Sequence, residues 1–164
     1  MFDTFFGLPL HPFIVHSTEV VVPTAALVVL LAAVWPRFRR WARFLPLGLA
    51  LAAVVLVPIS TESGESLQAR VGGSALINIH ANQAEGLLPW VIGLLVVAAV
   101  MQFWNYTQRA KTRSPKWVAI VIALAAVLTA TGTTVQAVII GHSGATAVWS
   151  EDMGTPAAPT GDND

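Results

Sequence analysis

The sequence contains no cysteine and few charged residues, and both absences narrow the class of protein. Without cysteine the chain has no disulfide, thiolate zinc site, iron–sulfur ligand or covalent c-type haem attachment. Only 11% of the 164 residues are charged, whereas soluble domains average about 25%. Lipid is therefore the expected surroundings of most of the chain. The formal net charge is +0 and no nucleic-acid motif occurs, so we expect no nucleic-acid partner.

Hydrophobic residues make up 55% of the chain, and they gather in four long apolar segments. A membrane-spanning helix needs about 20 mostly apolar residues, and the segments run over residues 12–35, 44–59, 79–104 and 117–140. The first has no basic stretch before it and exceeds the usual signal-peptide core of about 7–15 residues, which indicates a retained helix. The sequence predicts an all-α, four-helix transmembrane bundle over residues 1–149 and a disordered acidic tail over residues 150–164.

The basic residues predict how the bundle is oriented. Most of them lie in two loops, between the first two segments and between the last two: Arg37, Arg39, Arg40, Arg43, Arg109, Lys111, Arg113 and Lys116. The positive-inside rule places such loops in the cytoplasm. We therefore expect a multi-pass protein of the bacterial inner membrane, with both termini and a polar middle loop over residues 60–78 outside the cytoplasm. The fourth helix is expected to end at Gly141, a residue typical of helix C-termini.

The two halves of the sequence resemble each other and predict a pseudo-two-fold repeat of two hairpins. His16 with Pro23 in the first segment matches His80 with Pro89 in the third. Residues 62–64, Glu-Ser-Gly, take the place of residues 142–144, His-Ser-Gly. Chance similarity between apolar segments is the alternative that the sequence leaves open.

All histidines and several carboxylates fall toward the end of the bundle that holds the termini. An ionisable group at membrane depth costs about 2.5–3.5 kcal/mol at the centre of a helix, so such groups usually face the bundle interior and mark a site. The candidate cofactor ligands are His16, His80, His142 and His11, and the candidate metal ligands are His16, Glu19, His80, Glu85 and His142. His11 also fits a plain interfacial role, satisfied by water or backbone carbonyls.

One polar stripe runs along the fourth segment and is expected to face other helices. Thr129, Thr133 and Gln136 follow one another at helical spacing. Polar groups of this kind form hydrogen bonds between membrane helices, so the stripe predicts helix packing rather than a conduction path.

Several motifs resemble a bacterial family of transmembrane proteins, "domain of unknown function 2231". They are the segment Leu-Pro-Leu-His-Pro-Phe-Ile-Val-His over residues 8–16, His80, and Gly-His-Ser-Gly-Ala over residues 141–145 followed by Val148 and Trp149. The resemblance covers nearly the whole chain up to Trp149. It implies a four-helix membrane protein with histidines at the positions of His11, His16, His80 and His142. Fusion of some relatives to Rieske or cytochrome-like domains implies redox work, but no activity transfers with the resemblance.

Three functions remain open on the sequence. The first is binding of b-type haem for electron transfer, with His16 and His80 as the expected ligand pair. The second is binding of zinc, iron or copper by mixed imidazole and carboxylate ligands. The third is a structural or assembly subunit of a membrane complex. The expected partners are the lipid bilayer, a respiratory or redox membrane protein, or a second copy of the chain.

A stand-alone enzyme is not expected, and no catalytic residue is assigned. The sequence has no Gly-x-Ser-x-Gly nucleophile elbow, although serines lie close to histidines and glutamates. A zincin motif and a phosphate-binding loop are also missing.

Overall fold

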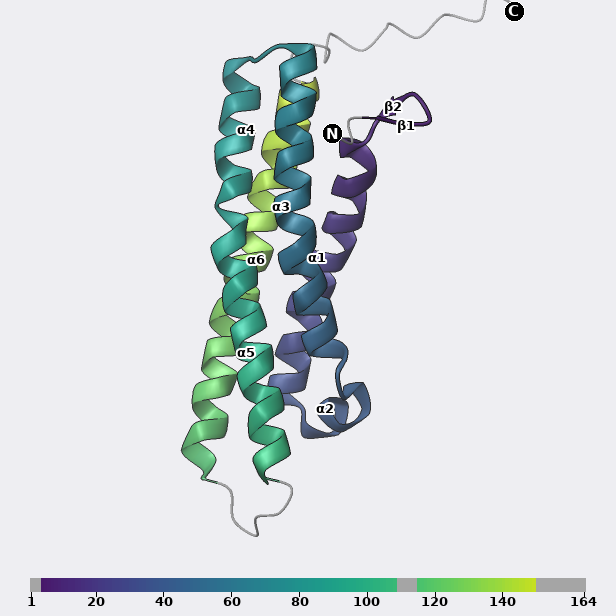
Figure 1. Ribbon diagram of the computed structural model, residues 1–164. Coiled ribbons are helices and arrows are strands. Elements are labelled where there is room, and N and C mark those ends of the chain that lie inside the picture. The colour runs from purple at the N-terminus through teal and green to yellow at the C-terminus, as the bar shows by residue number, and fades with distance from the viewer. Residues whose placement is uncertain (1–3, 109–114, 150–164) are drawn as a thin grey trace, which may run out of the picture.

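The protein is an antiparallel bundle of four long helical spans, which confirms the predicted fold class (Figure 1). The computed structural model describes residues 4–108 and 115–149, so the predicted tail and Arg109, Lys111 and Arg113 lie outside the described residues. The elements are β1 Thr4–Phe5, β2 Leu8–Pro9, α1 His11–Val34, α2 Pro36–Ala42, α3 Leu45–Val71, α4 Ala75–Glu85, α5 Leu87–Gln108 and α6 Lys116–Trp149. The spans are α1, α3, α4 with α5, and α6; the antiparallel pair β1–β2 is a small hairpin before α1.

Three helices continue well beyond the apolar segments that predicted them. The polar stretch expected as a loop over residues 60–78 is almost entirely helical, because α3 continues to Val71 and α4 begins at Ala75. The expected end of the fourth helix at Gly141 is also wrong, since α6 runs on to Trp149. At 1.5 Å per residue, the 34 residues of α6 measure about 51 Å. A hydrocarbon core is about 30 Å thick, so the bundle extends past it.

The turn between α3 and α4 is short because its sequence ends one helix and starts the next at once. Gly72 has φ +83°, the left-handed conformation that glycine adopts after a helix. Ser74 caps α4 by accepting a hydrogen bond from the backbone N–H of Ile77 at 3.2 Å. The side-chain amide of Gln68 donates to Asn78 Oδ1 at 2.8 Å, which ties the end of α3 to α4.

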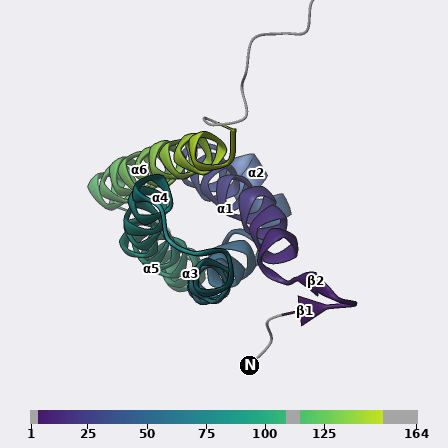
Figure 2. The same cartoon turned by 90° about the horizontal axis from the view of Figure 1, so that it is seen from above.

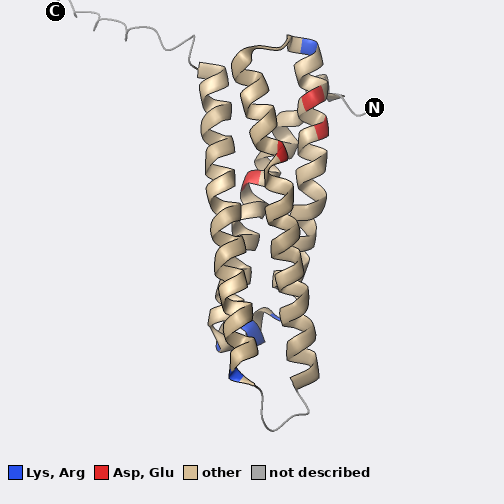
Figure 3. Ribbon diagram, turned by 90° about the vertical axis from the view of Figure 1, so that its left-hand side faces the viewer, with Lys and Arg blue, Asp and Glu red and all other residues tan. Residues whose placement is uncertain are grey.

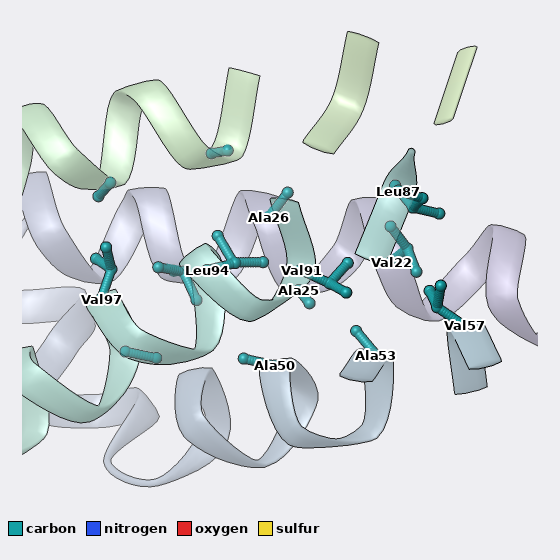
Figure 4. Close-up of a cluster of buried hydrophobic side chains, with 14 residues drawn as sticks. Val22, Ala25, Ala26, Ala50, Ala53, Val57, Leu87, Val91, Leu94 and Val97 are labelled. Atoms are coloured by element: carbon teal, nitrogen blue, oxygen red, sulfur yellow. The ribbon is translucent and has the colours of Figure 1, made fainter. Parts of the chain in front are cut away.

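Small side chains let the spans approach closely through the middle of the bundle. The buried residues of the main cluster shown in Figure 4 are Val22, Ala25, Ala26, Val29, Ala50, Ala53, Val57, Leu87, Val91, Leu94, Val97, Ala98, Ala126 and Ala130. Alanines bring helix backbones together and gain packing energy where lipid offers no hydrophobic driving force. Trp90 of α5 lies flat against Gly132 of α6, where an added Cβ would overlap the indole ring at 2.1 Å.

Burial follows the same register in both halves, which supports the predicted repeat. Most buried positions of α1 recur in α5 after 69 residues, and those of α3 recur in α6 after 80 residues. The first set pairs Thr18/Leu87, Val22/Val91, Ala25/Leu94, Val28/Val97, Val29/Ala98 and Ala32/Met101. The second set pairs Pro46/Ala126, Ala50/Ala130 and Ala53/Thr133. The first spacing pairs His80 with His11, not with His16 as the sequence motifs indicated.

Charge separates the two ends of the bundle (Figure 3). The "basic end" holds α2 with Arg37, Arg39 and Arg40, and the start of α6 with Lys116; the "histidine end" holds the N-terminus of α1, the α3–α4 turn and the end of α6 (Figure 1). Partial burial, and then the neighbouring charge of Arg40, lower the pKa of Arg39 from its usual value, but a guanidinium stays charged in proteins.

Candidate functional site

A pocket of about 530 Å³ opens among the helices at the histidine end. Figure 2 looks down on this end and shows α1, α3, α4 and α6 arranged around it. Val22, Val57 and Leu87 form its floor, and all three belong to the buried core. The pocket is therefore closed toward the middle of the bundle, and its volume lies within the range of about 300–1,000 Å³ typical of small-molecule sites.

The aromatic residues of the basic end indicate how deep the pocket lies in a membrane. Trp104 and Trp117 flank the α5–α6 connection, and tryptophan gathers at the membrane–water interface. About 20 helical residues cross the hydrocarbon core, which takes α5 and α4 back to Glu85 and α6 forward to Ala137. The histidines and most of the pocket lie beyond those two residues. The pocket is therefore at the level of the lipid headgroups.

His11 stands in the first turn of α1 and reaches across to α3. Its Nδ1 atom lies 3.0 Å from Ser63 Oγ, and the same hydroxyl donates to the carbonyl of Ser60 at 2.9 Å. Gly64 leaves room for the ring, because a Cβ at that position would lie 3.1 Å from Cε1 of His11. Pro12 follows in the first helical turn, where its missing N–H costs no hydrogen bond.

His80 repeats this arrangement in the second half of the chain. Its Nδ1 atom lies 3.0 Å from Ser143 Oγ, and Ser143 donates to the carbonyl of Ile140 at 2.9 Å. A Cβ at Gly144 would lie 3.0 Å from Cε1 of His80. We call the two arrangements the His–Ser–Gly units: His11, Ser63 and Gly64 in one, His80, Ser143 and Gly144 in the other.

The hydrogen bonds of each unit determine where the protons lie. A backbone carbonyl only accepts, so the single hydroxyl proton of Ser63 or Ser143 goes to the carbonyl. The serine oxygen then accepts from the imidazole, which places a proton on Nδ1 of His11 and of His80. In the neutral ring Nε2 keeps its lone pair. Neither serine is an activated nucleophile, because its proton is not given to the histidine.

The two imidazoles belong to one site. Both line the pocket, from α1 and from α4, and they lie close enough for their charges to interact. Because α1 and α4 carry equivalent positions of the repeat, the rings approach the pocket from two related sides. The pocket thus presents two neutral nitrogen donors to whatever it holds.

The other polar groups of the pocket are distributed unequally. Glu19 of α1, Glu65 of α3 and Glu85 of α4 line it, together with Gln68. The wall from α6 is uncharged and consists of small or apolar residues: Ala137, Ile140, Gly141, Gly144, Ala145, Ala147 and Val148. No Lys or Arg lines the pocket. A ligand therefore meets an acidic side and an apolar side.

The structure gathers only some of the residues that the sequence singled out. His16 is exposed, and its Nδ1 contacts the carbonyl of Pro12 on its own helix. His142 is exposed as well, and neither histidine lines the pocket. Of the candidate metal ligands, the pocket contains Glu19, His80 and Glu85. Within residues 4–108 and 115–149, no group of three or more His, Cys, Asp or Glu side chains could hold a metal ion, so the predicted five-residue metal centre is not assembled.

Sequence reasoning missed the two serines and the two glycines of the units. The Ser-Gly match at residues 63–64 and 143–144 was visible, but it was interpreted only as part of the repeat. The signal that would have found the units is the pair of spacings: the first pairs His11 with His80, and the second pairs the Ser-Gly dipeptides.

The polar stripe of α6 contacts the neighbouring span where α4 meets α5. The side-chain amide of Gln136 donates to the carbonyl of Gln83 at 2.7 Å, close to Gly86, where the helix is interrupted. Pro89 follows and lacks the N–H that would continue the helical bonds. Thr129 bonds back to its own helix, and Thr133 is fully buried. The bond from Gln136 joins two helices, as expected of a packing role.

The fold and the site define a class: a four-helix membrane protein with a histidine-lined pocket at one end. A family model described as "Predicted membrane protein (DUF2231)" matches residues 7–157, and the chain belongs to this family. No curated protein and no solved structure matches the chain. The resemblance that the sequence motifs indicated is therefore confirmed.

Proposed function

We propose that the pocket binds b-type haem, with His11 and His80 as its two axial ligands, and that the protein transfers electrons on the outer side of a bacterial inner membrane. The observation that carries this proposal is the pair of His–Ser–Gly units. Each unit engages Nδ1 of a histidine in a hydrogen bond and leaves Nε2 free toward a shared pocket. Membrane bundles commonly hold cofactors between side chains of facing helices.

The donor set fits haem better than it fits a bare metal ion. A haem iron takes four nitrogens from the porphyrin and needs only two from the protein, which is the number of imidazoles in the pocket. The apolar wall of α6 and the buried floor suit the porphyrin ring. With both axial positions occupied by protein, bound haem would supply one-electron transfer.

The three carboxylates add a condition to the fit. Haem carries two propionates, and no basic side chain of the pocket neutralises them. We expect the propionates to avoid Glu19, Glu65 and Glu85 by extending toward the open mouth of the pocket. The carboxylates also favour a cationic partner surface at this end, since opposite charges steer encounter.

The optical spectrum of the full chain, purified in mild detergent from a haem-producing host, tests the proposal. We expect a Soret band and, after reduction, the sharp visible bands of a low-spin haem. His11→Ala and His80→Ala should each abolish that spectrum. His16→Ala and His142→Ala serve as matched controls and should leave it unchanged, because both side chains are exposed outside the pocket.

Two results would overturn the proposal. One is a colourless protein that also fails to bind added haemin. The other is a haem spectrum that survives loss of both His11 and His80. Elemental analysis of the same preparation separates the alternatives: stoichiometric zinc or copper without haem would indicate a metal site, and a stoichiometric partner protein without cofactor would indicate a structural subunit.

A further inference from the structure

We infer that Ser63 and Ser143 are positioning residues that hold His11 and His80 in the Nδ1–H tautomer, so that both Nε2 atoms face the pocket. Neutral histidine in water favours the opposite tautomer, with its proton on Nε2. That form would leave no lone pair on Nε2 for a ligand. The serines therefore determine whether the two imidazoles can act as donors at all.

The assignment rests on hydrogen bonds that repeat in both halves. Each serine gives its proton to a carbonyl three residues earlier on its own helix, at 2.9 Å. This bond fixes the hydroxyl and turns an oxygen lone pair toward the histidine, whose Nδ1 is 3.0 Å away. Chance contact explains a single pair poorly when the same atoms meet in the same way after 69 residues in one helix and 80 in the other.

The neighbouring glycines complete the arrangement. Gly64 and Gly144 follow the two serines directly, and each leaves open the space against Cε1 of its histidine. The ring is thus held by a hydrogen bond on one atom and by close packing on the next. Both contacts come from the partner helix, so the orientation of each ring depends on the packing of two spans.

The consequence for an iron ligand rests on the proposed haem site, but the tautomer itself does not. A hydrogen-bond acceptor behind a ligating imidazole raises its basicity and fixes its orientation, and loss of such a partner typically costs about 10- to 100-fold in metal affinity. A more basic imidazole stabilises ferric haem. Ser63→Ala and Ser143→Ala should therefore weaken haem binding by about that factor and raise the reduction potential.

Nitrogen-15 NMR of the haem-free full chain, labelled at histidine and held in lipid nanodiscs above pH 8, tests the tautomer directly. We expect His11 and His80 to show a protonated Nδ1 and an unprotonated Nε2. Ser63→Ala should shift only His11 toward the Nε2–H form, and Ser143→Ala only His80. Ser63→Thr and Ser143→Thr, which keep the hydroxyl, should restore the wild-type signals.

Ser66→Ala is the matched control, because Ser66 makes the same kind of bond within α3, to the carbonyl of Glu62, and contacts no histidine. It should change neither ring. An Nε2–H tautomer in the wild-type protein would overturn the inference, as would equal shifts in Ser66→Ala and Ser63→Ala. Failure of the haem proposal would show instead as a missing optical spectrum with the tautomers intact.

Discussion

The ring of His80 lies directly against Gly144 of α6, so closely that a Cβ atom there would come within 3.0 Å of Cε1. Contacts this short force the neighbour to move by a few tenths of an ångström. Within Ser143 and Gly144, the sequence therefore combines a hydrogen-bond partner with an open surface. Position 144 is limited to glycine by the ring and not by backbone conformation, because it lies inside a continuous helix.

Gly144→Ala should impair ligand binding without destabilising the fold. The added methyl group displaces the ring of His80 from Ser143, while alanine favours the helix by about 1 kcal/mol over glycine. We expect haem affinity to fall by about tenfold or more and the unfolding temperature to stay equal or rise. Gly141→Ala is the control, since nothing lies within 4 Å of a Cβ there; equal effects of the two variants on affinity would contradict the prediction.

Gly132→Ala should lower stability, in contrast to the previous substitution. An added Cβ would overlap the ring of Trp90 at 2.1 Å, so the indole must leave its place between α5 and α6. Overpacking of this kind costs about 1–3 kcal/mol. Thermal unfolding in detergent should show a lower midpoint, whereas Gly48→Ala, which meets nothing within 4 Å, should not lower it. A Gly132→Ala midpoint at or above that of the wild type would refute the close α5–α6 packing.

Gln136→Leu should loosen α4 and leave the rest of the bundle in place. The substitution removes the side-chain donor to the carbonyl of Gln83, which then keeps only the 3.2 Å bond from the N–H of Gly86. A lost hydrogen bond of this type costs about 0.5–1.5 kcal/mol. Hydrogen exchange should become faster in residues 75–85 but not in α1. Thr134→Ala, which removes only a bond within α6, should show no such change; uniform acceleration would indicate global destabilisation instead.

The apolar segments predicted four spans correctly because a lipid core demands about 20 apolar residues whatever the neighbouring helices do. They could not predict where the helices end. Glu62 and Glu65 indicated a solvated loop, but α3 continues through them, since no glycine or proline interrupts it before Gly72. In the structure Glu65 lines a pocket, and that role depends on α1, α4 and α6.

The candidate site was predicted as a region but not as a set of residues. His80 was identified, and His11 was considered interfacial because it stands at the very start of α1. His16 was preferred because it lies nearer the first apolar segment and matches the motif around His80. Which histidine faces the pocket depends on the rotation of α1 against α3, and that rotation is determined by burial of positions such as Val22 and Ala25 along the whole helix. Apolar helices carry little amphipathic signal from which to predict it.

The absence of cysteine allows a direct test of the proposed orientation, in which the histidine end faces outside the cytoplasm. Asn82 is exposed on α4 at the histidine end, and Arg40 is exposed on α2 at the basic end. In spheroplasts, a membrane-impermeant maleimide should label Asn82→Cys at once and Arg40→Cys only after lysis, because the positive-inside rule keeps the basic loops in the cytoplasm. The cysteine-free wild type controls for background labelling. Labelling of Arg40→Cys alone in intact spheroplasts would invert the topology and direct the pocket toward the cytoplasm, whereas the hydrogen bonds within the pocket would be unaffected.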